Sequence, residues 1–252
     1  MTDSASMSQG KFDSRVARFW DEESTDWGRK YGKPSSYYYR CKTFHDFFLA
    51  TGLERASILD YGCGSGDITF PMLQAGHSVL GVDIARGMIG KAIERAEQAG
   101  FAPRASYFHL DDISLSAMPS ATFDVVVCSS VLEYVDDDRS LLKMFYGLLR
   151  DGGSLLVSVP DKSSLYCKLD KWLHANKRFL PRFIPVEKLG YLDIQKRQYD
   201  VKQFIREIEA SGFELTAKKH NTITLQRGVV MEKLSNIPGI GMLAIMMFKK
   251  VA

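Results

Sequence analysis

The sequence predicts a doubly wound α/β domain, in which helices cover both faces of a largely parallel sheet. Two observations lead to this prediction. From Ile58 onward, short apolar runs alternate with longer amphipathic stretches, and the runs are apolar throughout, as strands buried on both faces are. The glycine-rich stretch "ILDYGCGSGDITF" (58–70) also contains the first run and turns directly toward a helix, as the first strand of such a sheet does.

Length and composition agree with a single globular domain. The chain has 252 residues, of which 45% are hydrophobic and 25% are charged. Residues 1–50 are expected to form an N-terminal helical cap that is rich in aromatic side chains. Residues 51–252 are expected to form the α/β domain itself.

The expected elements follow one another along the chain. After helices within 12–50, "SILDY" (57–61) is the first strand, and helix and strand patterns then alternate. The further strands are expected at 77–83, 105–111, 123–130, 154–160 and 213–220, and the helices at 67–74, 88–98, 138–149 and 201–211.

Residues 161–200 interrupt this alternation. The stretch is basic and aromatic, contains two prolines and is longer than a connection between two elements requires, so we interpret it as a substrate-lid insertion. Residues 161–252 carry 17 Lys and Arg against 9 Asp and Glu, whereas residues 1–160 carry 16 against 21. This asymmetry indicates a solvated basic face, or else contact with an acidic substrate or a membrane surface.

The cysteines and the apolar runs of the sequence indicate the cellular compartment of the protein. The four cysteines form no C-x-x-C pair, which argues against a zinc site and a disulfide framework. The N-terminal residues lack the apolar core of a secretory signal, and no uncharged apolar run reaches the ~18 residues of a membrane-spanning helix. We therefore expect a cytoplasmic protein, either a monomer or a homodimer.

The glycine cluster predicts a ligand site. A strand that ends at Asp60 and turns through Gly62, Gly64 and Gly66 presents backbone N–H groups at the carboxyl edge of the sheet, and bare backbone there lets a nucleotide-like ligand approach closely. A dinucleotide fingerprint is G-x-G-x-x-G, whereas here the third glycine comes one residue early and Asp67 stands where that glycine is expected. The spacing therefore disfavours a nicotinamide dinucleotide. A glycine-rich turn without a ligand is the alternative.

An acidic residue at a strand end followed by G-x-G-x-G resembles the first motif of the class I S-adenosylmethionine-dependent methyltransferases. Further motifs extend the resemblance over residues 55–215: "VLGVDIARGMI", "HLDDI", "FDVVVCSSVLEYV" and "LLRDGGSLLVSVP". The resemblance implies a Rossmann-like, seven-stranded sheet with an antiparallel last strand, and S-adenosyl-L-methionine as methyl donor. It also implies that the apolar stretch "GMLAIMMFKK" (241–250) is this last strand rather than an amphipathic membrane anchor.

The same resemblance implies a set of cofactor-binding residues. Asp83 accepts from the ribose hydroxyls, and Asp112, or alternatively Asp111, accepts from the adenine amino group. Met88 packs on the adenine ring, and Arg40 binds the methionine carboxylate. The alternatives are a helix cap for Asp83, core packing for Met88 and a surface salt bridge for Arg40. The full implied set is Arg40, Asp60, Gly62, Cys63, Gly64, Gly66, Asp83, Ile84, Met88, Asp111, Asp112, Ile113 and Cys128.

The segment after the fourth expected strand supplies the catalytic candidates. It resembles the ubiquinone-pathway O-methyltransferases, which have an L-E-H-V run here and can place a divalent metal beside it. Glu133 matches this run, but Tyr134 replaces the histidine and Ser130 stands where another acidic residue is found, so we expect no metal. Glu133 and Tyr134 are expected to contact the acceptor, and His109 is a further candidate base. A solvent-facing helix start for Glu133 and a packed side chain for His109 are the alternatives.

Aromatic and basic side chains gather in the three segments expected to roof the acceptor pocket, 12–40, 161–200 and 221–236. The aromatic residues favour a flat or lipophilic acceptor, and the basic ones would suit a carboxylate or phosphate. Ordinary packing and a solvated face are the alternatives, and peripheral membrane contact is left open. The residues are Trp20, Trp27, Tyr31, Tyr37, Trp172, Phe179 and Tyr191, together with Lys168, Lys171, Lys177, Arg178 and Arg182.

The sequence therefore predicts an S-adenosylmethionine-dependent methyltransferase of a small, aromatic or lipophilic acceptor, with oxygen as the favoured atom. Methylation of RNA or protein is one alternative. No RNA-binding module and no N-P-P-Y signature is visible, "CSSV" standing in its place, so no nucleic-acid partner is expected. A catalytically silent cofactor-binding domain is the other alternative, although such a domain has no need of bare glycines beside carboxylates.

Overall fold

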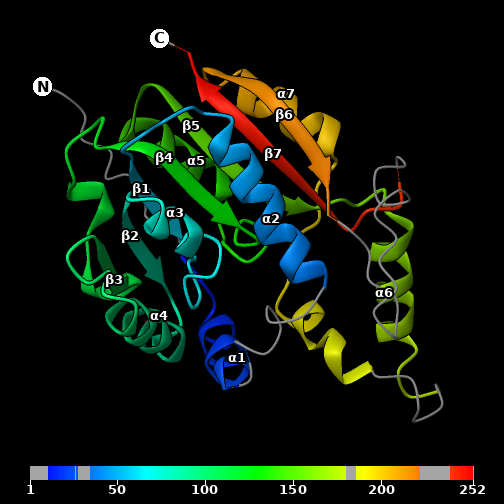
Figure 1. Ribbon diagram of the computed structural model, residues 1–252. Coiled ribbons are helices and arrows are strands. Elements are labelled where there is room, and N and C mark those ends of the chain that lie inside the picture. Colours follow the sequence, from blue (N-terminus) through cyan, green and yellow to red (C-terminus); the bar gives the residue numbers. More distant parts are fainter. Residues whose placement is uncertain (1–10, 26, 28–34, 180–185, 222–238, 252) are drawn as a thin grey trace, which may run out of the picture.

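The computed structural model describes residues 11–25, 27, 35–179, 186–221 and 239–251, and within these a seven-stranded sheet forms the centre of the molecule (Figure 1). The strand order is β3-β2-β1-β4-β5-β7-β6. Strands β1 to β5 pair in parallel, and β7 is antiparallel to both of its neighbours, β5 and β6. The strands are β1 (Ser57–Tyr61), β2 (Ser78–Asp83), β3 (Ala105–His109), β4 (Phe123–Ser129), β5 (Leu149–Pro160), β6 (Phe213–His220) and β7 (Leu243–Lys250). The predicted doubly wound sheet with an antiparallel last strand is confirmed.

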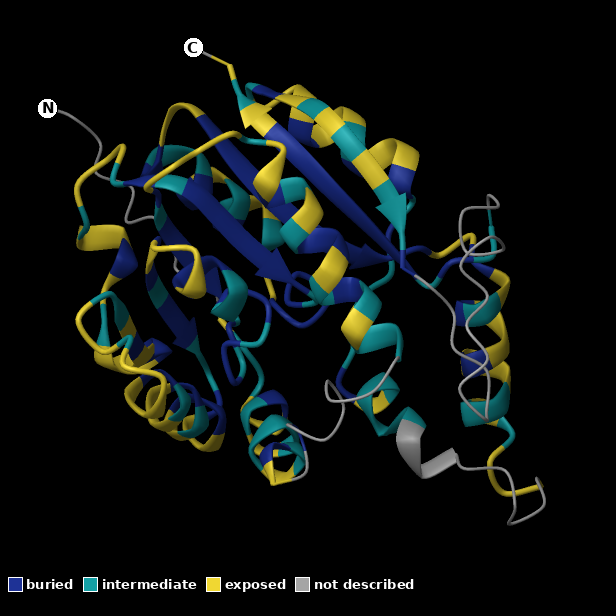
Figure 2. Cartoon of the chain, viewed as in Figure 1, coloured by how far each residue is buried: buried dark blue, intermediate teal, exposed yellow. Residues whose placement is uncertain are grey.

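Helices cover both faces of this sheet. Phe44 and Phe48 of α2 pack with Met72 of α3 against Ile58 and Val125 on one face. On the other face, α5 and α7 pack their apolar side chains against the same strands from the opposite side. The central strands are accordingly dark, buried ribbons in Figure 2, whereas the edge strand β6 is partly exposed, as are the outer faces of the helices. The helices are α1 (Ser14–Ser24), α2 (Ser36–Leu49), α3 (Phe70–Gln74), α4 (Arg86–Gln98), α5 (Asp138–Leu148), α6 (Leu165–Ala175) and α7 (Val201–Glu209).

The last strand confirms the interpretation of the apolar tail. Phe248 is paired with Leu155 of β5 and Leu215 of β6, and Leu243 to Met247 are buried in line with it. Because β7 lies between two strands and beneath helices, it is apolar on both faces. Lys250 at its end donates to the Leu149 carbonyl at 2.9 Å. Within the described ranges, no helix has the length and apolar character needed to span a bilayer.

Several element boundaries differ from the predicted ones. The helix expected at 67–74 begins only at Phe70, with Pro71 in its first turn, because Ile68 and Thr69 belong to the turn before it. Strand β3 ends at His109 rather than at 111, and residues 110–112 form a 3₁₀ turn, η2 (Leu110–Asp112). Strand β5 begins at Leu149 rather than at 154.

The described parts of residues 161–200 hold a helix and a 3₁₀ segment that contact each other beside the sheet. Ser164 caps α6, accepting from the N–H groups of Tyr166 and Cys167. The 3₁₀ segment η4 (Val186–Asp193) packs on α6, and the Tyr191 hydroxyl donates to the buried Asp170 carboxylate at 2.8 Å. The expected roof segment 221–236 lies outside the described residues except for Asn221.

Candidate active site

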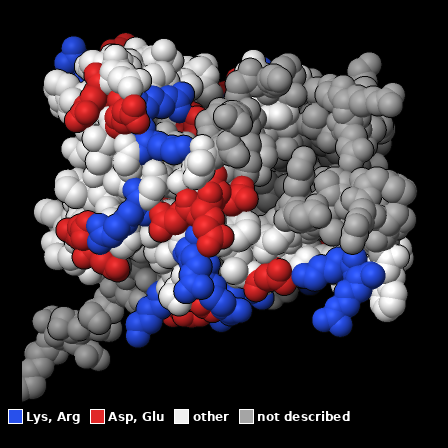
Figure 3. All heavy atoms as spheres, turned by 90° about the horizontal axis from the view of Figure 1, so that it is seen from below, with Lys and Arg blue, Asp and Glu red and all other residues white. Residues whose placement is uncertain are grey.

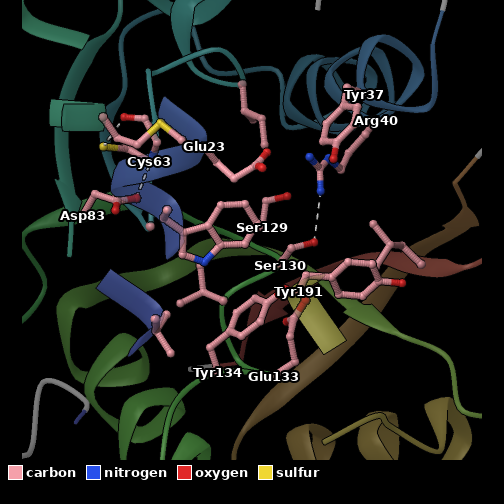
Figure 4. A pocket seen from close by; sticks show the side chains of 18 of the residues that line it. Glu23, Tyr37, Arg40, Cys63, Asp83, Ser129, Ser130, Glu133, Tyr134 and Tyr191 are labelled. Atoms are coloured by element: carbon pink, nitrogen blue, oxygen red, sulfur yellow. Dashed lines mark hydrogen bonds between the residues drawn. The ribbon is translucent and has the colours of Figure 1, made fainter. Parts of the chain in front are cut away.

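A cavity of about 750 Å³ opens at the carboxyl ends of β1, β2 and β4. Its wall is made by the glycine turn after β1, the end of β2 and the loop after β4, and α1, α2, α6 and η4 close over it. Figure 4 shows Asp83 and Cys63 at one side of this cavity and Arg40, Ser130 and Glu133 at the other. The volume is that of a small-molecule site.

The glycine turn is held in a conformation that other residues tolerate poorly. Gly62 has φ +74°, and a Cβ built on it would lie 2.1 Å from Cγ2 of Val131. The N–H groups of Gly62 and Cys63 both donate to the Val82 carbonyl, at 2.8 and 3.0 Å, which ties the turn to β2. Bare backbone at Gly62 therefore lets the loop after β4 approach the floor of the cavity.

Asp83 ends β2 and joins this turn to α4. Its carboxylate accepts from the N–H groups of Gly64 and Ala85, both at 2.8 Å, and it lines the cavity. Burial raises the pKa of Asp83, and the two backbone hydrogen bonds oppose that rise. The carboxylate is thus fixed by the backbone with an edge toward the cavity, in a position suited to accepting hydroxyl hydrogen bonds.

Asp60 is buried behind the cavity wall, unlike Asp83. It is 1% exposed and does not line the cavity, and it accepts from the Thr69 hydroxyl at 2.7 Å. Burial raises the pKa of Asp60 to about 7. Because Thr69 immediately precedes α3, this hydrogen bond joins the end of β1 to the start of the helix on the far side of the glycine turn.

Glu133 is a buried acid in the cavity wall. It is 2% exposed, and its Oε2 atom has no hydrogen-bond partner within the described ranges. Burial raises the pKa of its carboxyl group to about 8. The segment is fixed from behind, since the N–H of Lys196 donates to the Glu133 carbonyl at 2.8 Å and the Tyr199 hydroxyl donates to the Leu132 carbonyl at 3.0 Å. The neighbouring Tyr134 is also buried in the wall, and burial holds the pKa of its phenol well above the usual range.

Arg40 reaches the same wall from α2. It is 8% exposed, its Nη1 donates to Ser130 Oγ at 3.0 Å, and its guanidinium lies 4.8 Å from the centre of the Tyr37 ring. Ser130 has φ +55°, a left-handed conformation that costs a non-glycine residue free energy and is common at functional sites. The Ser158 hydroxyl accepts from the N–H of Ser130 at 3.1 Å and helps to hold this turn.

The cavity brings together most of the predicted site residues, but not all. In its wall are Arg40, Gly62, Cys63, Gly64, Asp83, Ile84, Met88, Glu133 and Tyr134, and outside it are Asp60, Gly66, His109, Asp111, Asp112, Ile113 and Cys128.

The residues that follow β3 turn away from the cavity. The Asp112 carboxylate pairs with Arg86 at 3.0 Å and is half exposed, and Asp111 is exposed. Both nitrogens of His109 are engaged, Nε2 with the Ile84 carbonyl at 2.8 Å and Nδ1 with the N–H of Asp111 at 3.2 Å. Leu110 is the residue of this turn that lines the cavity. This placement lends no support to His109 as a base.

The predicted roof is present only in part. Trp20, Trp27, Tyr37 and Tyr191 line the cavity, and Tyr31 and Arg182 lie outside the described residues. The remaining predicted roof residues are exposed and absent from the wall: Lys168, Lys171, Trp172, Lys177, Arg178 and Phe179.

Some wall residues were not predicted individually, although they lie in segments that were expected to roof the pocket. Glu23 faces the cavity from α1, and the signal for it was present, because Val16, Phe19, Trp20 and Glu23 follow the i, i+3, i+4, i+7 spacing of one helical face. Asn221 and Gln195 also line the cavity. Neither belongs to a motif, and only the packing of distant segments brings them there.

The donor set beside Glu133 does not fit a divalent metal. Carboxylates and imidazoles are the side chains that hold Mg²⁺, Mn²⁺ and similar ions, and Ser130 and Tyr134 replace two of the three that the resemblance implies. In the part of the chain that the structure describes, no group of three or more His, Cys, Asp or Glu side chains is arranged to hold a metal ion. The residues do fit S-adenosylmethionine, since the backbone of Gly62 and Gly64 and the Asp83 carboxylate line one cavity.

A family model described as a methyltransferase domain matches residues 35–218. The chain therefore belongs to this family and is a class I S-adenosylmethionine-dependent methyltransferase, with S-adenosylmethionine as its methyl donor.

Individual relatives agree with this assignment. The ubiquinone biosynthesis O-methyltransferase of Cronobacter sakazakii is 25% identical over 234 residues, which cover 91% of this chain and 87% of that protein. The enzyme of the same name from Ralstonia nicotianae is 30% identical over 160 residues, or 64% of this chain and 61% of that protein.

Solved structures share the fold at lower identity. The magnesium protoporphyrin IX methyltransferase of Synechocystis PCC 6803, solved with bound SAH, has a TM-score of 0.66 at 17% identity, and the match covers 94% of this chain and 99% of that one. The cyclase SpnF has a TM-score of 0.67 at 15% identity, and the match covers 96% and 98%. At these identities the likeness is one of fold alone.

Proposed function

We propose that this methyltransferase transfers a methyl group to the oxygen of a small, uncharged, lipophilic acceptor. The observation that carries the proposal is the buried carboxyl of Glu133, whose Oε2 atom has no hydrogen-bond partner among the described residues. It lies in the wall of a cavity to which eight aromatic side chains contribute. An acceptor hydroxyl supplies the missing donor. The O-methyltransferase names of the relatives support the choice of oxygen.

The charges of the wall support an uncharged acceptor. Its acidic side chains are Glu23, Asp67, Asp83 and Glu133, and Arg40 is its basic residue among those described. The exposed lysines of α6 lie outside the wall, so they offer nothing to a carboxylate or phosphate inside it. An anionic acceptor would have a single basic residue to pair with among these acids, whereas a phenol or alcohol needs no such partner.

The chain's own residues have separable tasks in this proposal. When bound, S-adenosylmethionine supplies a methyl group on a positively charged sulfonium, which is already activated for transfer. The Asp83 carboxylate accepts from the ribose, Arg40 binds the carboxylate of the methionine end, and Met88 packs on the adenine. Glu133 orients the acceptor hydroxyl and takes its proton. The enclosing helices exclude water, and such alignment lowers a barrier by about 7–11 kcal/mol when the geometry is good.

Residues 161–200 act as the acceptor's lid in this proposal, and residues 1–50 as a cap over the cofactor. Cys167 of α6 and Tyr191 of η4 line the cavity, and so do aromatic residues of α1 and α2. The lid is anchored to the sheet beneath, because the Ser164 hydroxyl donates to the Ile240 carbonyl at 3.0 Å just before β7.

The alternative acceptors, RNA and protein, find less support. On the face seen in Figure 3, Lys and Arg side chains are interspersed with Asp and Glu over the described surface rather than gathered into one basic patch. Nucleic-acid binding relies on such a patch.

The test is a screen for S-adenosylhomocysteine release with the purified protein. Phenols, catechols and hydroxylated quinone precursors are expected to give turnover, and benzoates and phosphorylated analogues of the same size are expected to give much less. Turnover with the carboxylates and none with the hydroxyl compounds would contradict the proposal. A cytoplasmic location and a monomeric or homodimeric state stay predictions, and light scattering of the purified protein measures the second.

A further inference from the structure

The end of β4 offers one carboxyl group where a divalent-metal site needs several hard ligands. Of the three positions at which the resemblance to ubiquinone-pathway enzymes implies ligands, only 133 carries an acid. Tyr134 places a phenol, not an imidazole, in the buried part of the wall. Ser130 Oγ is already engaged, as it accepts from Arg40 at 3.0 Å. The site thus lacks the donors that would replace a metal's hydration shell.

Arg40 also places a fixed positive charge at this point. A guanidinium stays protonated at any pH at which the protein is folded. Arg40 and Glu133 lie in the wall of the same cavity and are both buried, at 8% and 2% exposure. A divalent cation beside Glu133 would be repelled by this neighbouring charge, and repulsion is strong where both groups are removed from water. In Figure 4 the Arg40 side chain points from α2 toward Ser130, on the side of the cavity that also holds Glu133.

We propose, resting on the function proposed above, that Glu133 binds the acceptor hydroxyl directly and that methyl transfer needs no divalent cation, with Arg40 providing the positive charge on this side of the cavity. The acceptor's O–H proton passes to the Glu133 carboxylate. The acceptor oxygen forms the new C–O bond, and the donor sulfur keeps the electron pair of the C–S bond that breaks. Atoms and charge balance without a further reactant.

The test measures metal binding without any acceptor. Protein treated with EDTA and desalted is mixed with Mn²⁺, and the free ion is quantified by its electron paramagnetic resonance signal. We expect wild-type protein at 100 μM, with and without S-adenosylhomocysteine, to leave the free-ion signal at its buffer value. Stoichiometric uptake of Mn²⁺ that is lost in Glu133→Gln would overturn the proposal.

Two variants test the assignment to individual residues. The double variant Ser130→Glu with Tyr134→His restores the implied ligand set and is expected to take up Mn²⁺. In the absence of S-adenosylhomocysteine, whose carboxylate would pair with Arg40, adding Arg40→Gln removes the nearby positive charge and is expected to tighten that uptake several-fold. If the double variant takes up no Mn²⁺ although it still binds S-adenosylhomocysteine in calorimetry, the assignment to these two positions is wrong. If Arg40→Gln leaves the Mn²⁺ affinity unchanged, the role given to Arg40 is wrong.

Turnover gives an independent reading once an acceptor is found. We expect the rate of S-adenosylhomocysteine release to change less than two-fold on adding EDTA, Mg²⁺ or Mn²⁺. A ten-fold loss in EDTA that Mg²⁺ restores would overturn the proposal. Because the Mn²⁺ measurement uses no acceptor, failure of the proposed O-methylation would show in the acceptor screen and leave the metal result standing.

Discussion

Glu133 lies buried beside the turn that follows β4, and this burial raises the pKa of its carboxyl group to about 8. At pH 7 the group is therefore largely protonated in the absence of substrate, although its proposed task is to accept a proton. A base whose pKa lies near the working pH is well matched to this task. The same burial has a cost, because a carboxyl group whose pKa is raised on folding destabilises the protein progressively as the pH rises from about 4.5 to about 8.

The first prediction concerns the pH dependence of turnover. Because Glu133 must lose its proton before it can accept another, the rate should rise with pH and level off above about 8. Arg40 is the neighbouring charge that lowers the pKa of Glu133 against the effect of burial. The thiol of Cys128 and the phenols of Tyr134 and Tyr199 have pKa values raised mainly by burial, and the Glu133 charge raises them further, so these three groups stay neutral there. In Glu133→Gln the rate should no longer rise with pH in this way. It should also be lower by about 10²- to 10⁴-fold, as loss of a general base causes.

Two controls accompany this variant. Glu133→Gln should keep wild-type affinity for S-adenosylhomocysteine, and its melting temperature at pH 8 should exceed that of wild type, since no charge is buried there. A variant with the wild-type pH profile would show that Glu133 is not the base.

The second prediction concerns Asp83. Its carboxylate holds the N–H groups of Gly64 and Ala85 and faces the cavity, so Asp83→Ala should weaken S-adenosylmethionine binding by about ten-fold or more, the effect of losing a charge-assisted hydrogen bond. Calorimetry measures this directly. Asp112→Ala is the matched comparison, because the Asp112 carboxylate pairs with Arg86 outside the cavity and its loss should change the affinity less than two-fold. Equal losses in the two variants would restore the adenine role first expected of Asp112.

At the scale of elements, adding a side chain is expected to destabilise the glycine turn after β1 and to stabilise the helix after β2. Gly62→Ala would place a methyl group 2.1 Å from Val131 at φ +74°, and we expect a loss of about 1–3 kcal/mol in the free energy of unfolding together with weaker cofactor binding. Gly90 lies in α4, and a Cβ added to it would have no other atom within 4 Å, so Gly90→Ala should stabilise the protein by about 0.5–1 kcal/mol. Thermal unfolding of both variants checks the pair. An equal change in melting temperature for the two variants would show that neither the conformation of Gly62 nor the helical position of Gly90 controls stability as expected.

The lid offers a further prediction at this scale. Tyr191 of η4 lines the cavity and donates to Asp170 of α6, so Tyr191→Phe should loosen the contact between the two segments and raise the KM for the acceptor several-fold. The dissociation constant for S-adenosylmethionine should stay within two-fold. Tyr146→Phe serves as the control, because Tyr146 lies on α5 outside the cavity and should change neither constant. A change in cofactor affinity alone would place Tyr191 in the cofactor site instead.

Sequence patterns predicted the sheet and the side of the cavity that holds Gly62 and Asp83, because both depend on local sequence. Apolar runs fix the strands, and the backbone register at a strand end fixes where Gly62 and Asp83 point. Asp112 shows the limit of this reasoning. Once β3 ends at His109, a 3₁₀ turn decides the direction of the following side chains, and it turns Leu110 inward and the two acids outward. Asn221 opens a segment that was expected to roof the pocket, but no local pattern singles this residue out. It follows β6, and its N–H donates to the Leu243 carbonyl of β7 at 2.8 Å.

At the scale of the whole molecule, the basic character of the C-terminal part lies largely outside the cavity. Helix α6 carries Leu165, Leu169 and Trp172 on one exposed face, at 64%, 52% and 56% exposure, with Lys168 and Lys171 beside them. The i, i+4, i+7 spacing makes this a continuous apolar stripe flanked by positive charge, a pattern typical of helices that lie on a membrane surface.

The corresponding prediction uses lipid vesicles. The protein should co-float with vesicles containing anionic phosphatidylglycerol and bind neutral phosphatidylcholine vesicles much less, because apolar contact and charge attraction act together. Leu169→Glu with Trp172→Glu should abolish the binding, whereas Ile93→Glu, which replaces an exposed apolar side chain on α4, should not. Flotation that is equal for all three proteins would contradict a role for α6.

The antiparallel last strand also sets the order in which the molecule can be completed during synthesis. Strand β6 leaves the ribosome before β7, yet β7 is its sole partner in the described sheet, and β7 must enter between β5 and β6. Until residues 243–250 have emerged, β5 exposes an unpaired edge and the segment of β6 has nothing to join. A nascent chain in that state has an unpaired strand edge, which can bind chaperones or pair with other chains in aggregates.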